Sequence, residues 1–326
     1  MRNFTFKGLL LTAVFMLLGC LSIQAANDDL ITKQITINLD KAGTLPNKIA
    51  SSEMYKITNL KIIGEINGTD WNMIREMAGR DNRGYDTEGK LSELDLSEAK
   101  IVKGGDSYYS GDNCYTSNDE IGEYAFKDCS RLTSLTLPVG ITSIGYDAFA
   151  YCSGLTSLTL PAGITSIGEY AFSGCSGLTS LTLPAGITSI DKYAFSGCSR
   201  LTSLTLPAGI TSIGEFAFSY CSGLTSIYVY AEKVPRIGRY AFEGCASRKC
   251  TLYVPKGTYD NFRLSEFGYF ENIVEFDATG IDKTTTSTDV EEVSRYSLNG
   301  QRLVGPTKGL NIVKYSDGSV KKVAVE

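Results

Sequence analysis

The sequence predicts a solenoid of stacked short β-strands, and two observations carry this prediction. Cysteines recur at a constant interval, at Cys129, Cys152, Cys175, Cys198 and Cys221, and Cys245 follows with the interval lengthened by a single position. The residues between them are nearly identical from one interval to the next, as in residues 154–175 and their copy at 177–198. A fixed period of this length is typical of repeat architectures, in which each unit stacks on the next.

Each unit opens with the spacing Leu-x-x-Leu-x-Leu, which is the strand signature of leucine-rich repeats. One copy consists of Leu155, Leu158 and Leu160. Alternate side chains of a strand point to opposite faces. The two later leucines are therefore expected to point inward, and the serine and threonine beside them outward.

The rest of the unit turns the chain back toward the next strand. Pro161 ends the strand because it has no N–H to donate, and Gly163 permits a turn. Ile164 and Ile167 predict a second short extended segment, and Phe172 returns a ring to the core on a short helical turn. One unit cannot bury these side chains alone, so neighbours must share a continuous core. The predicted fold is a leucine-rich repeat solenoid, mainly β with short helical turns in 23-residue repeats.

The repeated block has the form Leu-Thr-Ser-Leu-Thr-Leu-Pro-x-Gly-Ile-Thr-Ser-Ile-Gly-x-x-Ala-Phe-x-x-Cys. It resembles the BspA-like leucine-rich repeats of bacterial surface antigens, and the resemblance extends over residues 55–276. The resemblance implies a secreted or surface protein that binds other macromolecules. Several members of that family are adhesins for host matrix proteins.

Residues 1–25 are predicted to be a secretory signal peptide, with a basic start and an apolar run too short to span a membrane. Small residues predict cleavage near Ala25. A second interpretation stays open, because the residues that end at Cys20 resemble a lipobox, in which Cys20 would be lipidated and become the mature N-terminus. We favour cleavage near Ala25, since Leu21 is an indifferent residue after a lipidated cysteine.

Residues 26–56 are predicted to cap the N-terminal end, and the solenoid is predicted over residues 57–255. Its first strand has a degenerate form of the repeat spacing at residues 57–62, and the second follows at residues 91–96. A helix is expected between them at residues 69–77, capped by Thr69 or Asp70. Apolar side chains at spacings of three define the inward face of that helix. These side chains are Trp71, Ile74 and Met77.

Residues 104–119 are an insert rich in Tyr, Ser, Gly and Asn. Antibody contact loops have this composition, because tyrosine gives a large contact area at low entropic cost. The insert is therefore a candidate binding epitope with Tyr108, Tyr109 and Tyr115 as contact residues. The alternative is a polar surface loop that packs its own tyrosines on the side of the solenoid.

Residues 256–276 are predicted to be a helix-like C-terminal cap that lays apolar side chains on the open end of the core. These side chains are Tyr259, Phe262, Phe267, Phe270 and Ile273. A linker is predicted at residues 277–294, followed by a small β tail at residues 295–326. Its three predicted strands are 296–303, 309–315 and 320–325. The tail resembles the C-terminal sorting domains of Bacteroides-type secretion, which implies export or surface attachment; a small structural β module is the alternative.

Two repeated rows are expected on the outside of the solenoid. The outward strand positions form a ladder of serine and threonine hydroxyls, which suits an extended partner or simply a solvated sheet. The position before Ala-Phe is nearly always aromatic, so its residues are further candidate binding residues. These are Tyr170, Tyr193 and Tyr240. Exposed rings would mark a contact surface and half-buried rings would be packing, and the sequence leaves both open.

Composition excludes several classes of function. The chain has 326 residues, a net charge of −5 and no histidine. A chain with no basic excess is not expected to bind nucleic acid, and one without histidine lacks the usual base of hydrolytic triads. The eight cysteines after Cys20 are expected to be buried free thiols, with Cys114, Cys245 and Cys250 as the candidate exceptions; a disulfide framework, which would suit an exported chain, is the alternative. We expect no cofactor and no metal.

The sequence therefore predicts a non-enzymatic, secreted or surface-associated recognition protein. It is adhesin-like and binds an extracellular or host protein. A carbohydrate-binding surface protein with a polysaccharide ligand and a structural spacer are the alternatives. Membrane contact is expected only through lipid attachment at Cys20 or a surface anchor.

Overall fold

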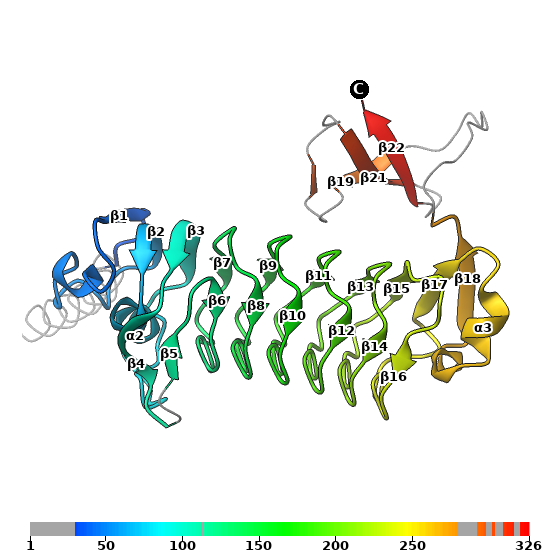
Figure 1. Ribbon diagram of the computed structural model, residues 1–326, viewed down its shortest axis with the longest axis horizontal. Coiled ribbons are helices and arrows are strands. Elements are labelled where there is room, and N and C mark those ends of the chain that lie inside the picture. Colours follow the sequence, from blue (N-terminus) through cyan, green and yellow to red (C-terminus); the bar gives the residue numbers. More distant parts are fainter. Residues whose placement is uncertain are drawn as a thin grey trace, which may run out of the picture.

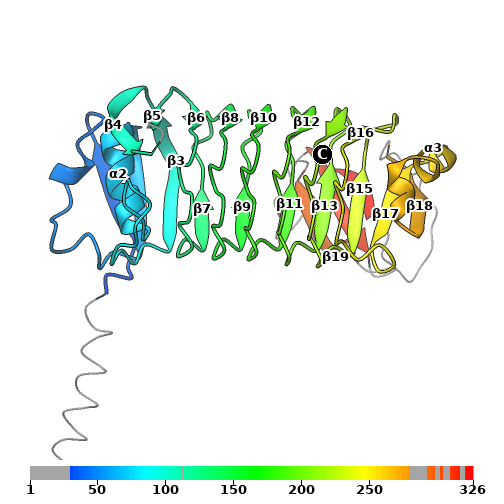
Figure 2. The same cartoon turned by 90° about the horizontal axis from the view of Figure 1, so that it is seen from below.

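Ten short strands lie side by side in parallel along an elongated solenoid (Figures 1 and 2). The computed structural model describes residues 30–111, 114–278, 292–297, 302–303, 309–315 and 320–325. The first five strands are β1 (Ile35–Leu39), β2 (Asn59–Ile66), β3 (Glu93–Ile101), β7 (Ser134–Thr136) and β9 (Ser157–Thr159). The next five are β11 (Ser180–Thr182), β13 (Ser203–Leu206), β15 (Ser226–Val229), β17 (Thr251–Pro255) and β18 (Asn272–Phe276). The Thr179 N–H donates to the Thr156 carbonyl at 3.2 Å and joins the two sets.

The predicted leucine-rich repeat solenoid is confirmed, and its register follows the repeat. Leu135 pairs with Leu158, and Leu181 pairs with Leu204, so leucines of successive units stack inside. A second row of two-residue strands forms another side of the solenoid. It contains β6 (Glu120–Ile121), β8 (Ser143–Ile144), β10 (Ser166–Ile167), β12 (Ser189–Ile190), β14 (Ser212–Ile213) and β16 (Arg236–Ile237). The Ala-Phe segments form hydrogen-bonded turns rather than the predicted helical turns.

A column of six phenylalanine rings fills the core behind these turns. Its members are Phe126, Phe149, Phe172, Phe195, Phe218 and Phe242. Neighbouring ring centroids are 5.0 to 5.5 Å apart, and the rings are nearly parallel. All six are buried. We call this column the inner ladder.

Aromatic side chains close both ends of the inner ladder. At the N-terminal end Trp71 lies 5.2 Å from Phe126, and at the C-terminal end Phe267 and Phe270 lie 5.7 and 5.3 Å from Phe242. The exposed faces of a stacked core need such covers, because no further repeat buries them. The C-terminal rings belong to the predicted cap, whereas Trp71 comes from the helix that was predicted within the solenoid, between its first two strands.

The N-terminal cover is the helix α2 (Gly68–Met77), in which Trp71, Ile74 and Met77 are buried as predicted. Its N-cap is Asn67, so the expected caps Thr69 and Asp70 were wrong. Asp70 is instead the reciprocal partner in a capping box, where its carboxylate accepts from the Asn67 N–H at 2.9 Å.

The carboxylate of Asp70 also ties the N-terminal segment to α2. It accepts from the N–H groups of Gly43 and Leu45, and Leu45 begins the short 3₁₀ helix η1 (Leu45–Asn47). Asp70 is fully buried. A buried carboxylate is tolerated when donors satisfy it, and here three backbone N–H groups do so.

The C-terminal cap differs from the predicted helix. Only α3 (Tyr259–Arg263) and the 3₁₀ helix η2 (Glu266–Tyr269) are helical, and the chain then returns as β18, which pairs with β17. Phe262, Phe267 and Phe270 are buried as expected, whereas Tyr259 is exposed. The strand forms because the edge of β17 offers unpaired backbone groups that a helix would leave open.

The repeat cysteines are buried free thiols, as predicted, and Cys250 is one as well; Cys114 is also buried. Each thiol from the second repeat onward donates to a phenylalanine carbonyl of the unit before it. Cys152 donates to Phe126 at 3.0 Å, and Cys175 to Phe149 at 3.1 Å. Burial raises the pKa of the Cys129 thiol to about 11. The Cys129 thiol therefore stays protonated and unreactive at neutral pH.

The C-terminal tail forms a four-stranded antiparallel sheet in the order β20-β19-β21-β22. Its strands are β19 (Glu292–Ser297), β20 (Arg302–Leu303), β21 (Gly309–Tyr315) and β22 (Val320–Val325). The first predicted strand is thus two strands, and it begins inside the predicted linker. The rest of that linker, apart from residues 277–278, lies outside the described residues, as do the signal peptide, Cys20 and Ala25.

Candidate binding surface

The turn before each Ala-Phe pair has a left-handed backbone, although its residue is not glycine. The φ angles lie between 52° and 59° at Tyr124, Asp147, Tyr170, Tyr193, Phe216 and Tyr240. Bulky residues rarely adopt this conformation. Hydrogen bonds to the next repeat hold it: the Tyr170 N–H donates to the Lys192 carbonyl, and the Phe172 N–H to the Ala194 carbonyl at 2.7 Å.

The rings at this turn form a second aromatic column along the side of the solenoid. Its members are Tyr109, Tyr124, Tyr146, Tyr170, Tyr193, Phe216 and Tyr240. Neighbouring centroids are 4.6 to 5.7 Å apart. We call this column the outer ladder. Its rings are half-buried, except for Tyr240, which is 52% exposed.

The sequence pattern left a gap in this row at Asp147, and the structure fills it with Tyr146. Asp147 takes the left-handed position and pairs through its carboxylate with the Lys127 amine. The Tyr146 ring joins the outer ladder from one residue earlier and packs edge-on against Tyr124 and Tyr170. The adjacent tyrosine in the sequence was the signal that could have revealed this substitution.

The insert joins the same column, so two candidate regions of the sequence form one surface. It folds as the hairpin β4 (Gly104–Tyr109) and β5 (Cys114–Thr116), and the Tyr109 ring stacks on Tyr124 at 4.6 Å. The guanidinium of Arg75 lies 5.5 Å from the centre of the Tyr109 ring. The outer ladder thus starts in the hairpin and runs through the repeats.

The hairpin packs closely on α2. A Cβ at Gly68 would overlap the Asp106 carbonyl, so the close approach requires glycine there. Tyr108 points into the core, where its hydroxyl donates to the Glu123 carbonyl at 3.0 Å, and only 1% of it is exposed. Tyr108 therefore belongs to the packing, as the alternative interpretation of the insert expects, whereas Tyr115 is 57% exposed.

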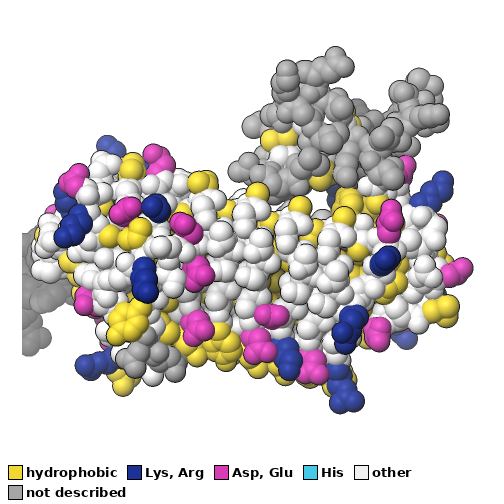
Figure 3. Space-filling model, in the orientation of Figure 1, with side chains coloured by type: hydrophobic (Ala, Val, Ile, Leu, Met, Phe, Trp, Pro, Cys, Tyr) yellow, Lys and Arg dark blue, Asp and Glu magenta, His cyan; other side chains and the backbone are white. Residues whose placement is uncertain are grey.

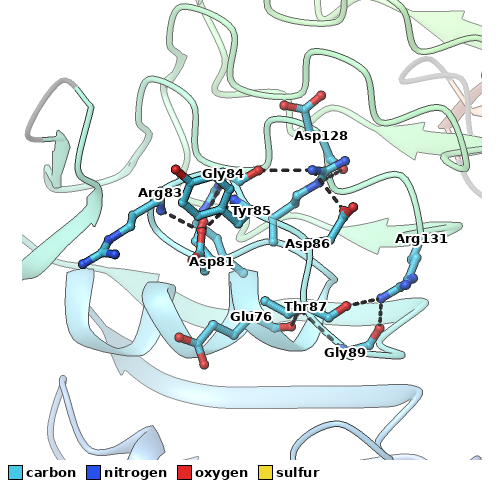
Figure 4. A network of polar contacts seen from close by, with 12 residues as sticks. Glu76, Asp81, Arg83, Gly84, Tyr85, Asp86, Thr87, Gly89, Asp128 and Arg131 are labelled. Atoms are coloured by element: carbon cyan, nitrogen blue, oxygen red, sulfur yellow. Dashed lines mark hydrogen bonds and ion pairs between the residues drawn. The ribbon is translucent and has the colours of Figure 1, made fainter.

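A loop after α2 extends the surface beside the hairpin (Figure 4). The Asp81 carboxylate accepts from the N–H groups of Arg83 and Tyr85 at 2.8 Å each, which shapes the loop tip. The Ser110 N–H of the hairpin donates to the Asn82 carbonyl at 2.8 Å. Tyr85 is 68% exposed, and sequence reasoning missed it because no repeat marks this loop.

Two arginines fix the loop to the first repeats. Arg80 forms an ion pair with Asp86 at 3.0 Å and donates to the Asp128 carbonyl at 3.1 Å. Arg131 donates to the carbonyls of Thr87 and Gly89 (Figure 4). The loop is therefore held rigidly next to the hairpin.

Charged residues flank the outer ladder, because one directly precedes each of five rings: Glu123, Glu169, Lys192, Glu215 and Arg239. Burial and the neighbouring phenols Tyr193 and Tyr146 raise the pKa of Tyr170, so this phenol is neutral at physiological pH. Charged side chains gather at the ends and along the lower edge of the face in Figure 3, and the middle is mostly uncharged. Within the described ranges, no group of three or more Cys, Asp or Glu residues could hold a metal ion. No helix in those ranges is long and apolar enough to cross a membrane.

Comparison with known proteins identifies the repeats. Residues 119–249 match the family model of the BspA type leucine-rich repeat region, in six copies. The match covers the repeats that carry both aromatic ladders and leaves the hairpin and the tail outside. A search of curated proteins found no match.

Several solved structures resemble the chain. A leucine-rich repeat protein of T. pallidum is 31% identical, over 37% of this chain and 55% of that one, with a TM-score of 0.34. One from Bacteroides ovatus is 26% identical, over 44% and 49%, with a TM-score of 0.34. A leucine-rich cell surface protein of Faecalibacterium prausnitzii is 23% identical, over 68% and 51%, with a TM-score of 0.35. The chain spans about half the length of these proteins.

Proposed function

We propose that the protein is a non-enzymatic, surface-associated recognition protein whose BspA-type repeats bind an extracellular protein partner through the outer ladder and the hairpin. The observation that carries the proposal is the continuity of the surface: seven aromatic rings, each packed against the next, run from Tyr109 to Tyr240 without interruption. Rigid, partly exposed tyrosines are the residues that dominate protein interfaces.

The scaffold supports this role. Loops and turns held by a rigid core can present contact residues with little loss of entropy on binding. Here the left-handed turns, the inner ladder and the arginine contacts of the loop all fix the backbone under the rings. An array of different aromatic and polar groups along one edge fits an extended protein surface better than a small substrate.

Binding of the full chain to a panel of extracellular matrix proteins tests the proposal. Two variant pairs divide the surface: Tyr109→Ser with Tyr115→Ser in the hairpin, and Tyr170→Gly with Tyr193→Gly in the ladder. Tyr259→Ser, in the C-terminal cap, is the matched control, since Tyr259 is 42% exposed and far along the chain from the ladder. We expect roughly tenfold weaker binding or more from either pair.

Each outcome assigns the surface. Loss in the hairpin pair alone would confine the site to the insert. Loss in the ladder pair alone would move it to the repeats. No binding to any matrix protein by a folded sample would reject the proposal and favour the structural spacer.

The route to the surface is a second part of the proposal. The tail resembles sorting domains, and the segment 1–25 has the features of a signal peptide. We expect a chain that lacks residues 295–326 to accumulate in the periplasm instead of at the cell surface. Mass spectrometry of the mature N-terminus distinguishes cleavage near Ala25 from lipidation at Cys20.

A further inference from the structure

Two exposed tyrosines lie in a third row, separate from both ladders. Tyr151 and Tyr220 occupy the same position of their repeats, two residues after the inner-ladder phenylalanine. They are 56% and 58% exposed, more than any ring of the outer ladder. Both have left-handed backbones, with φ of 60° and 57°. Three other repeats place glycine here, at Gly174, Gly197 and Gly244.

Each of the two rings lies against a glycine of the next repeat. A Cβ added at Gly174 would come within 2.6 Å of Cδ1 of Tyr151, and one at Gly244 within 2.8 Å of Cδ1 of Tyr220. The glycines therefore make room for rings that lie along the surface with one side open. Glycine would fit the left-handed backbone at 151 and 220 without strain, so the core gives no reason for tyrosine there.

The row positions between the two rings are both glycine, and the exposed Arg200 lies three residues after the second of them. They are Gly174 and Gly197, and serines flank both glycines in the chain at Ser173, Ser176, Ser196 and Ser199. The first repeat has the charged residue Asp128 at the equivalent position, which lies before Tyr151 and therefore outside the stretch between the two tyrosines. Rings of the inner ladder advance 5.0 to 5.3 Å per repeat over this stretch. Three repeats thus separate the two tyrosines by about 15 Å.

We propose that Tyr151 and Tyr220 form a two-platform site for a linear neutral polysaccharide. A pyranose ring has a flat face of C–H groups that packs on an aromatic face, and its rim of hydroxyls matches neighbouring serine hydroxyls. The row positions between the two tyrosines carry no charged side chain of their own, which favours a neutral ligand. A polymer can cover both platforms at once, which raises its affinity over that of a short sugar.

This site uses different rings from the outer ladder. The polysaccharide proposal and the protein-binding proposal can therefore be rejected independently of each other. The test is affinity electrophoresis of the full chain through gels that contain soluble β-glucan, xylan or mannan. The decisive variant is Tyr151→Gly with Tyr220→Gly, which copies the glycines of the other repeats and keeps the left-handed backbone. Tyr259→Ser, which changes an exposed tyrosine of the C-terminal cap outside the row, is the matched control.

We expect at least one neutral polysaccharide to retard the protein, with affinity lowered roughly tenfold or more in the double variant and unchanged in the control. Variants in which only one of the two tyrosines is replaced should bind the polysaccharide about as weakly as one platform allows. Oligosaccharides too short to reach both rings should bind the parent protein about as weakly. Thermal unfolding of the double variant should match the parent. Retardation that persists in the double variant, or none in any of the three gels, would overturn the proposal. A further outcome would also overturn the polysaccharide proposal: no polysaccharide binds the parent, but the double variant loses binding to a protein partner. That result would assign the row to the protein partner.

Discussion

The inner and outer ladders run along the same repeats with nearly the same spacing, yet they differ in burial. Phe172 and its neighbours are wholly enclosed, whereas Tyr170 and Tyr193, which come from the adjacent turn, keep part of their rings in solvent. The inner rings stack face to face throughout, and the outer rings switch to edge-on packing at Tyr146. Stacking alone therefore does not tell a core from a contact surface; the fraction of each ring left in water does.

Removal of one inner ring should have the largest effect on stability. Phe172→Ala leaves a cavity between two stacked rings and should lower the free energy of unfolding by about 3–5 kcal/mol. Tyr170→Ala, two residues earlier, should lower it by about 1 kcal/mol or less. Urea unfolding followed by circular dichroism measures both. Equal losses would mean that the two ladders contribute alike.

The thiols beside the inner ladder should make stability depend on alkaline pH. The folded pKa of Cys129 is about 11, and an unfolded cysteine has a pKa of about 8.5. Between these values the unfolded chain has lost the proton that the folded chain keeps. Stability is therefore complete below pH ~8.5 and falls as the pH rises toward 11, by about 1.4 kcal/mol per unit for one thiol.

Cys129→Ala removes that contribution and provides the comparison. The difference in unfolding free energy between parent and variant should be constant from pH 6 to about 8 and should shrink steadily above about 8.5. Urea unfolding at a series of pH values measures it. Parallel curves up to pH 11 would show that this thiol is accessible to solvent in the folded protein.

Loss of the Lys127–Asp147 ion pair should have an intermediate effect on the free energy of unfolding. Asp147 occupies the turn position that an aromatic residue holds in the other repeats. Asp147 is 7% exposed and accepts from the Lys127 amine, which also lies 5.0 Å from the Tyr124 ring centre. Asp147→Asn keeps a side chain that tolerates the left-handed backbone but removes the charge. We expect a loss of about 1–2 kcal/mol in urea unfolding at pH 7. Lys192→Met, which removes a wider, exposed ion pair with Glu215, is the control.

The smallest effect is expected at an outer ring. Tyr193→Gly loses the stacking with Tyr170 and Phe216 but releases the left-handed backbone strain of a bulky residue. Each contribution is about 1 kcal/mol, and they have opposite signs, so the net change in unfolding free energy should stay within about 1 kcal/mol. A loss as large as that of Phe172→Ala would contradict the assignment of the outer ladder to the surface.

The sequence determined the repeat, the inward leucines and the free thiols. It could do so because a constant repeat period places equivalent side chains in register, and only stacking buries them. Even the irregular helix with Trp71 was predictable, because its apolar residues fall on one face.

Only the tertiary structure decided which tyrosines face solvent. Tyr108 and Tyr109 are neighbours in the sequence with the same composition around them, but one lies in the core and the other stacks on Tyr124. Tyr151 and Tyr220 gain their exposed faces from Gly174 and Gly244, each of which belongs to the following repeat. Exposure depends on what the next repeat places against a ring, and that contact exists only after the repeats have stacked.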